Sequence, residues 1–118
     1  MSRDYKLYLD DIVESCEKIQ TFAAGMSYEA FIQDERTIDA IVRNLEIIGE
    51  AVKNVPGEWL EMQPQIEWKN IARLRDIIVH RYFKVELDVV WGIVNERIEE
   101  LRKAVQFLLD NLEDSEPE

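Results

Sequence analysis

Apolar residues recur at intervals of three and four along most of this chain, which is the pattern of helices with one buried face. The first such stripe predicts a helix over residues 4–23, which Gly25 ends. A short helical turn capped by Ser27 follows, and Asp34 then caps a second long helix whose stripe reaches Val55. These two stripes comprise Leu9, Ile12, Cys16, Ile19 and Ala23, and then Ile38, Ile41, Leu45, Ile48, Val52 and Val55.

Two further stripes predict a third and a fourth long helix. Pro56 and Gly57 stop the second helix, residues 57–65 form a connector, and the fourth helix runs from Glu86 to near Asn111. The third stripe comprises Ile66, Ile71, Leu74, Ile78 and Tyr82, and the fourth comprises Val90, Ile93, Leu101, Val105, Leu108 and Leu112. Because strand-like alternation never exceeds a few residues, we expect an all-α fold: an antiparallel four-helix bundle with a short extra helical turn.

Length and composition suit one compact domain. The chain has 118 residues, 47% of them apolar, and we assign residues 1–112 to a single helical domain and 113–118 to an acidic tail. No apolar run approaches the roughly 20 residues that span a bilayer, so we expect a cytoplasmic protein without a membrane segment. Cys16 is the only cysteine, which favours a core thiol. Core or interface anchoring is likewise the expected role of Trp59, Trp68 and Trp91.

Charge is unevenly distributed along the chain. The net charge is −11, which argues against a general nucleic-acid coat and against DNA as a partner. Between Trp68 and Lys84, however, five basic residues stand against one acid, so this segment carries +4 and the remainder carries −15. A solvated helix face would explain such a segment, and so would a site for a local anionic ligand such as RNA. The five basic residues are Lys69, Arg73, Arg75, Arg81 and Lys84.

The same segment contains the only histidine, in the run RDIIVHRYF at 75–83. His80 can exchange a proton near neutral pH, Arg75 can grip a phosphate, and Tyr82 can position a phosphate or stack a base, which suits phosphodiester cleavage without a metal. A structural histidine paired with Asp76 is the plainer alternative. A metal site at Asp76 and His80 would need further ligands, so we predict no metal and no cofactor.

Helix geometry separates the two catalytic candidates. On an ideal helix His80 lies roughly 140° around from Arg75 and about 7.5 Å along the axis. The two side chains therefore converge only with help from the long arginine, a distorted helix end, or a second subunit.

The run Arg, four residues, His, one residue, Tyr resembles the signature of the HEPN superfamily, specifically the HepT-like toxins. Arg75, His80 and Tyr82 match its three places. DERTIDAIVRNLEIIGEAV at 34–52 resembles the family's second-helix block, and VELDVVWGIV at 85–94 resembles the helix after the motif. The resemblance thus covers most of the chain.

The resemblance implies a HEPN-like helical homodimer, with assembly beyond the dimer left open, whose paired motif helices line a cleft. It implies a metal-independent endoribonuclease with Arg75 and His80 as catalytic residues. It also implies a toxin whose antitoxin, a nucleotidyltransferase of the MNT type, attaches AMP to Tyr82. The residues expected to support the site or bind RNA are Lys69, Arg73, Asp76, Arg81 and Lys84.

Two positions depart from the family pattern. Lys84 stands where Gly is frequent, and Asp76 stands where Asn is frequent, so an attenuated or inactive member stays open. One alternative is a non-catalytic helical accessory subunit that presents Tyr82 to a nucleotidyltransferase. A second alternative is a purely structural dimerisation bundle in which Arg75 and His80 form buried polar links.

Overall fold

The computed structural model describes residues 4–74 and 86–112, and every regular element within these ranges is a helix. The all-α prediction is therefore confirmed. In the described ranges no helix is long and apolar enough to cross a bilayer. The elements are α1 (Tyr5–Ala23), α2 (Tyr28–Gln33), α3 (Glu35–Lys53), α4 (Gly57–Leu60), α5 (Trp68–Ala72), α7 (Leu87–Glu96) and α8 (Ile98–Leu112).

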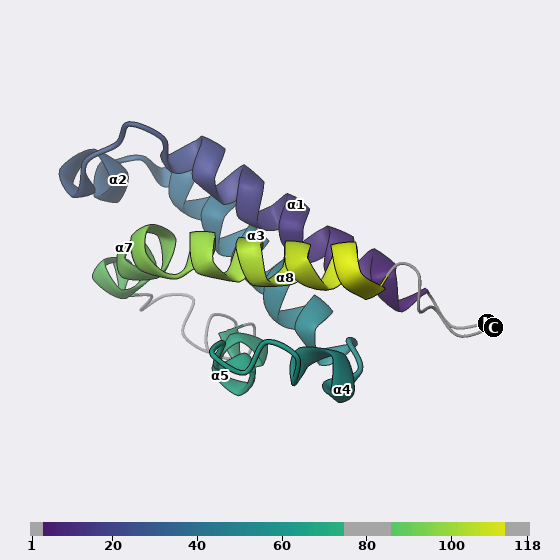
Figure 1. The fold of residues 1–118 in the computed structure, drawn as a ribbon. Helices are drawn as coiled ribbons and strands as arrows, with labels where there is room; N and C mark the ends of the chain where they lie inside the picture. Colours follow the sequence, from purple (N-terminus) through teal and green to yellow (C-terminus); the bar gives the residue numbers. More distant parts are fainter. Residues whose placement is uncertain (1–3, 75–85, 113–118) are drawn as a thin grey trace.

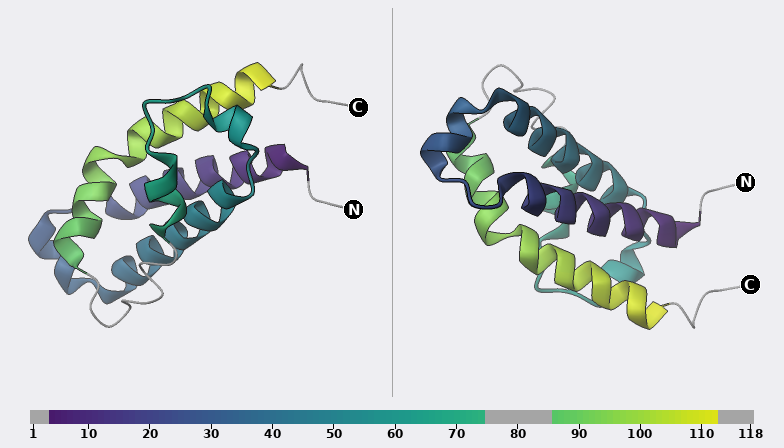
Figure 2. Two further views of the ribbon diagram at one scale, coloured as in Figure 1. Left: turned by 90° about the horizontal axis from the view of Figure 1, so that it is seen from below. Right: turned by 90° about the horizontal axis from the view of Figure 1, so that it is seen from above.

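Helices α1, α3 and α8 form the body of the molecule (Figure 1). Helix α1 runs antiparallel to both of the others, and the side chain of Gln20 near its end donates to Glu99 at the beginning of α8, at 2.7 Å. Figure 2 shows α1 and the α4–α5 segment on opposite sides of α3 and α8. Helices α2 and α7 close one end, where they pack against each other. This layout places α5 against α3 and leaves its other side toward α8.

The predicted stripes form the core. Most stripe residues on α1, α3 and α8 are buried, because α1 packs against both α3 and α8 and each helix turns its apolar face inward. Cys16 is buried among them, and this burial raises the pKa of its thiol to about 12, so its role as a core thiol is confirmed. The fully buried stripe residues are Leu9, Ile12, Cys16, Ile19, Ile41, Leu45, Ile48, Val105 and Leu108.

Polar side chains cap the helix starts as expected. The hydroxyl of Ser27 accepts from the backbone N–H of Ala30 at 3.1 Å, and the carboxylate of Asp34 accepts from that of Thr37 at 3.1 Å. Both caps satisfy N–H groups that have no partner within the helix. Gly25 has φ +76°, a left-handed conformation that favours glycine, and it follows the end of α1 as predicted.

We expect the Asp34 cap to make stability depend on pH. The hydrogen bond from the Thr37 backbone lowers the pKa of Asp34 below its ordinary 3.8. When folding lowers the pKa of a carboxyl group, the ionised group stabilises the fold at pH values above the pKa that it has in the unfolded chain. This contribution is lost as the pH falls through the pKa that it has in the folded protein. Asp34→Asn keeps a capping oxygen but cannot titrate. In thermal melts, the difference in Tm between the parent and this variant should therefore shrink as pH falls below 3.8. A difference in Tm that does not change with pH would contradict a stabilising role for the ionised carboxylate of Asp34.

The connector is more ordered than predicted. Helix α3 ends at Lys53, ahead of Pro56, and Pro56 then occupies the N-cap of α4 instead of only stopping the preceding helix. Proline tolerates the position before a helix because its ring fixes φ at about −65°, and Pro56 has φ −56° and ψ 136°. The ring of Trp59 on α4 packs edge-on against Tyr5, with 6.0 Å between ring centroids and 89° between planes. Aromatic packing therefore ties this short helix to the beginning of α1.

The third predicted helix begins later than expected and is described only in part. Ile66 is buried but lies before the helix, and α5 starts at Trp68. The indole N–H of Trp68 donates to the carbonyls of Leu60 and Gln63 at 2.9 and 3.0 Å, which fixes the helix start against the connector. Helix α5 ends at Ala72, with Arg73 as its C-cap, and the predicted continuation beyond Leu74 lies outside the described residues.

The prediction of one continuous fourth helix was wrong. The chain breaks at Arg97, with φ −118° and ψ −29°, into α7 and α8. Trp91 on α7 stacks on Phe31 of α2, with 4.7 Å between ring centroids, whereas α8 packs along α1. We attribute the break to these two packing targets, because a change of direction lets the chain cover both α2 and α1. Tryptophans 59, 68 and 91 all pack against the core, which confirms their predicted anchoring role.

Candidate functional site

The residues of the predicted motif lie outside the part of the chain that the structure describes. This holds for both catalytic candidates, for the predicted modification site and for three of the supporting residues. The remaining two, Lys69 and Arg73, lie on and directly after α5. The residues outside the described ranges are Arg75, Asp76, His80, Arg81, Tyr82 and Lys84.

Helix α5 has a basic side and an apolar side. Lys69 and Arg73 are four residues apart, so they lie on the same face of the helical turn, and both are exposed. Ile71 and Leu74 lie on the opposite side and pack against the core. The apolar contacts hold α5 in place, and its two exposed cations can attract an anion from solution. Both precede the motif in the sequence.

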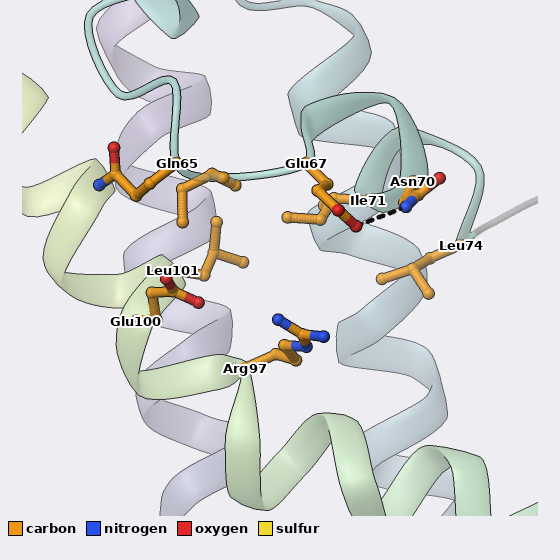
Figure 3. Close-up of a pocket in the computed structure, with 9 residues that line it drawn as sticks. Gln65, Glu67, Asn70, Ile71, Leu74, Arg97, Glu100 and Leu101 are labelled. Carbon is orange, nitrogen blue, oxygen red and sulfur yellow. Dashed lines mark hydrogen bonds between the residues drawn. The ribbon is translucent and has the colours of Figure 1, made fainter.

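A pocket of about 270 Å³ lies on the apolar side of α5 (Figure 3). It is bounded by the connector before α5, by α5 itself and by the chain from Arg97 into α8. Its apolar lining comes from Ile66, Ile71, Leu74 and Leu101. One of these residues, Leu74, immediately precedes the motif in the sequence.

Polar side chains surround this apolar lining. Asn70 donates to Glu67 at 2.8 Å, drawn in Figure 3, and Gln65 donates to Gln63 at 2.7 Å. The guanidinium of Arg97 points into the space between α5 and α8, and the carboxylate of Glu100 lies on the α8 side.

The side chains of Arg97 and Glu100 are both exposed. Within residues 4–74 and 86–112, neither makes a side-chain hydrogen bond or ion pair. The pocket thus offers Arg97 and Glu100 to a ligand, beside Glu67, whose carboxylate also accepts a hydrogen bond from Asn70.

The neighbouring acid on α8 behaves differently. Glu99 accepts two hydrogen bonds from Arg102, at 2.9 and 2.7 Å, and one from Gln20 at 2.7 Å. The hydrogen bonds from Arg102 are the main cause that lowers the pKa of Glu99 to about 2. Glu99 therefore joins α8 to α1, and Glu100, one residue further along, is the acid that faces the pocket.

Metal-ligating side chains do not cluster in the described ranges. Among residues 4–74 and 86–112, no three His, Cys, Asp or Glu side chains come together in an arrangement that could hold a metal ion. The two acids of the pocket, Glu67 and Glu100, contribute hydrogen-bond acceptors and negative charge to its lining.

Comparison with known proteins identifies the family. The family model described as "Ribonuclease HepT-like" matches residues 12–108, and the chain belongs to this family of HEPN-like all-α proteins. A Thermococcus cleftensis protein named "Probable ribonuclease HepT" is 43% identical over 102 residues, covering 86% of this chain and 93% of its own. A Methanocaldococcus jannaschii protein named "Putative RNase MJ0127" is 36% identical over 111 residues, covering 94% and 92%. No solved structure gave a significant match.

Sequence reasoning missed the polar residues of the pocket. It treated Arg97 and Glu100 as parts of an uninterrupted fourth helix and Gln65 as part of the connector over residues 57–65. Neither glycine nor proline marks the break at Arg97, so the local sequence carries no signal for it. Only the packing of α7 and α8 on different partners brings these side chains opposite α5.

Proposed function

We propose that this chain is a metal-independent endoribonuclease in which Arg75 and His80 carry out the cleavage. One observation carries the proposal: the sequence Arg75, four residues, His80, one residue, Tyr82 falls within the 12–108 match to a ribonuclease family. The exposed cations Lys69 and Arg73 directly precede this motif and supply attraction for an RNA backbone. Lys84 and Arg81 add to the same basic segment of the sequence.

The proposed reaction uses the RNA's own 2′-hydroxyl. Histidine accepts the proton of that hydroxyl as its oxygen bonds to the adjacent phosphorus. The bond from phosphorus to the 5′-oxygen breaks, and a protonated histidine returns a proton to the leaving oxygen. The products are a 2′,3′-cyclic phosphate and a 5′-hydroxyl. Arg75 stabilises the charge that builds on the phosphoryl oxygens, for which a planar, permanently charged guanidinium is well suited.

We propose that the working unit is a homodimer. On a single ideal helix Arg75 and His80 diverge by roughly 140°, whereas two motif segments facing one cleft would supply a base, an acid and two phosphate clamps. Pairing the two segments also gathers about +8 in an otherwise acidic assembly, since each segment carries +4. Such a concentration of charge would direct a single RNA strand to the cleft.

We further propose that the chain is the toxin of a toxin–antitoxin pair and that an MNT-type nucleotidyltransferase inhibits it by attaching AMP to Tyr82. The phenol oxygen would attack the α-phosphorus of ATP, with pyrophosphate as the leaving group. An added phosphate and nucleoside would block an RNA cleft by both charge and bulk.

Mass spectrometry of the protein co-expressed with such a nucleotidyltransferase tests this regulation. We expect one AMP or more on the parent, located at Tyr82, and no modification of Tyr82→Phe. We also expect the modified parent to lose RNA cleavage, because the anionic adduct competes with the substrate's phosphate. A parent that stays unmodified at Tyr82, or a modified parent that still cleaves fully, would refute the proposal.

The test of the function itself is cleavage of total cellular RNA by unmodified protein in excess EDTA. We expect fragments that end in 2′,3′-cyclic phosphate. No cleavage by protein shown to be folded and unmodified would favour the non-catalytic accessory subunit, in which the helical dimer only presents Tyr82 to its partner.

A further inference from the structure

The pocket between α5 and the start of α8 has no part in the chemistry proposed for Arg75 and His80. Leu74, which forms part of its lining, directly precedes Arg75 in the sequence.

The lining suits a flat molecule with a polar edge. Ile71, Leu74 and Leu101 provide apolar surface against which an aromatic ring can pack. The guanidinium of Arg97 is planar and can stack on a base, and the carboxylate of Glu100 can accept a hydrogen bond from a base amino group. Both groups are available, because neither is engaged elsewhere in residues 4–74 and 86–112.

Other occupants fit less well. A bare phosphate would meet Arg97 but also the carboxylates of Glu67 and Glu100, which repel it. A purely apolar ligand would cover part of the exposed side chains of Arg97 and Glu100 without giving either a partner, which is unfavourable. A neutral, flat ring with donors and acceptors on its edge satisfies both the apolar lining and the polar groups.

We propose that this pocket binds one unstacked base of the RNA substrate. The inference rests on the proposed endoribonuclease function and adds a base-binding subsite to it. Single-stranded RNA is the form in which bases can leave their stack and enter such a pocket. A free nucleotide shares this base chemistry, so the test must separate the two sources.

The test measures binding of short 2′-O-methyl RNA oligonucleotides in which one base at a time is removed. The methyl group blocks the attacking hydroxyl, so affinity is measured by fluorescence anisotropy without cleavage. For the parent, we expect loss of the base at one position to weaken binding on the order of tenfold, the usual effect of losing a stacked base. Loss at most other positions should have a smaller effect.

Arg97→Ala links this position to the pocket. In this variant the contact between Arg97 and the base is already lost. We therefore expect removal of the base at that position to weaken binding less than it does in the parent, and removal at other positions to have the same effect as in the parent. Glu100→Gln, which preserves side-chain shape, should shrink the same penalty for an amino-bearing base. The matched control is Arg43→Ala: Arg43 is exposed on α3 and lies outside the pocket, so the position-dependent pattern should persist.

Several outcomes would overturn the inference: no oligonucleotide binding, no position-dependent penalty, or the same penalty in Arg97→Ala as in the parent. Free AMP gives the second arm. Displacement of a base-containing oligonucleotide by micromolar AMP, without any position effect, would assign the pocket to free nucleotides and overturn the RNA assignment. Failure of the proposed function is distinguishable, because it would appear as absent cleavage of unmethylated RNA by the parent, whatever the binding pattern.

Discussion

His80→Ala should abolish cleavage of RNA in excess EDTA and leave the fold intact. Removal of a general acid–base group costs about 10²–10⁴-fold in rate, so cleavage should fall to background over the time in which the parent digests its substrate. Arg75→Ala should have a comparable effect, because it removes the cation proposed to stabilise the phosphorane. Arg43→Ala is the control for loss of one arginine and should keep cleavage close to the parental rate.

Cleavage, partner binding and Tm of these variants together distinguish three interpretations of the motif. Lost cleavage with an unchanged Tm and retained nucleotidyltransferase binding indicates a catalytic His80. Absent cleavage by the parent itself, with partner binding intact in every variant, indicates the accessory subunit. A large fall in Tm for His80→Ala or Arg75→Ala, measured by circular dichroism, indicates buried polar links in a structural dimer.

Mixing the two inactive variants tests the composite cleft. If Arg75 of one copy works with His80 of the other, dimers formed from His80→Ala and Arg75→Ala chains retain one such pair, with one His80 in place of the two that would share the roles of base and acid. Co-refolded mixtures should then recover part of the cleavage that neither variant shows alone. No recovery, despite mixed dimers detected by native mass spectrometry, would contradict a cleft shared in this way.

Phe31→Ala should cause the largest loss of stability among substitutions in the described ranges. Phe31 is fully buried, is the largest such side chain, and stacks on Trp91 with ring centroids 4.7 Å apart. Removal of a buried phenylalanine costs about 3–5 kcal/mol, because it leaves a cavity in addition to the lost burial. For a domain whose total stability is about 5–15 kcal/mol, this is a large fraction. Urea unfolding followed by circular dichroism measures it.

Ile32→Ala is the matched control, since Ile32 is the next residue of α2 and is 38% exposed. It changes the same helix at a position outside the core, so its effect should be well under half that of Phe31→Ala. Equal losses would mean that α2 contributes through helix formation, and that the contact with Trp91 is not what holds α2 and α7 together.

Local sequence was sufficient for the first half of the fold. The stripes on α1 and α3 place their apolar residues at helical spacing, and the caps Ser27 and Asp34 act through N–H groups three residues away. Both signals lie within one helix, so they can be read without knowing its neighbours. The motif at Arg75, His80 and Tyr82 was equally visible, although its geometry lies outside the described residues.

Features set by residues close together in the sequence could be predicted from it, and features set by contacts between distant residues could not. The sequence by itself determined the all-α class and the buried faces of α1, α3 and α8. It also located the basic segment and the motif within that segment. Only the tertiary structure decided the break at Arg97 and the pocket opposite α5. These depend on contacts between residues far apart in the chain, such as Phe31 with Trp91, and no local propensity at Arg97 encodes them.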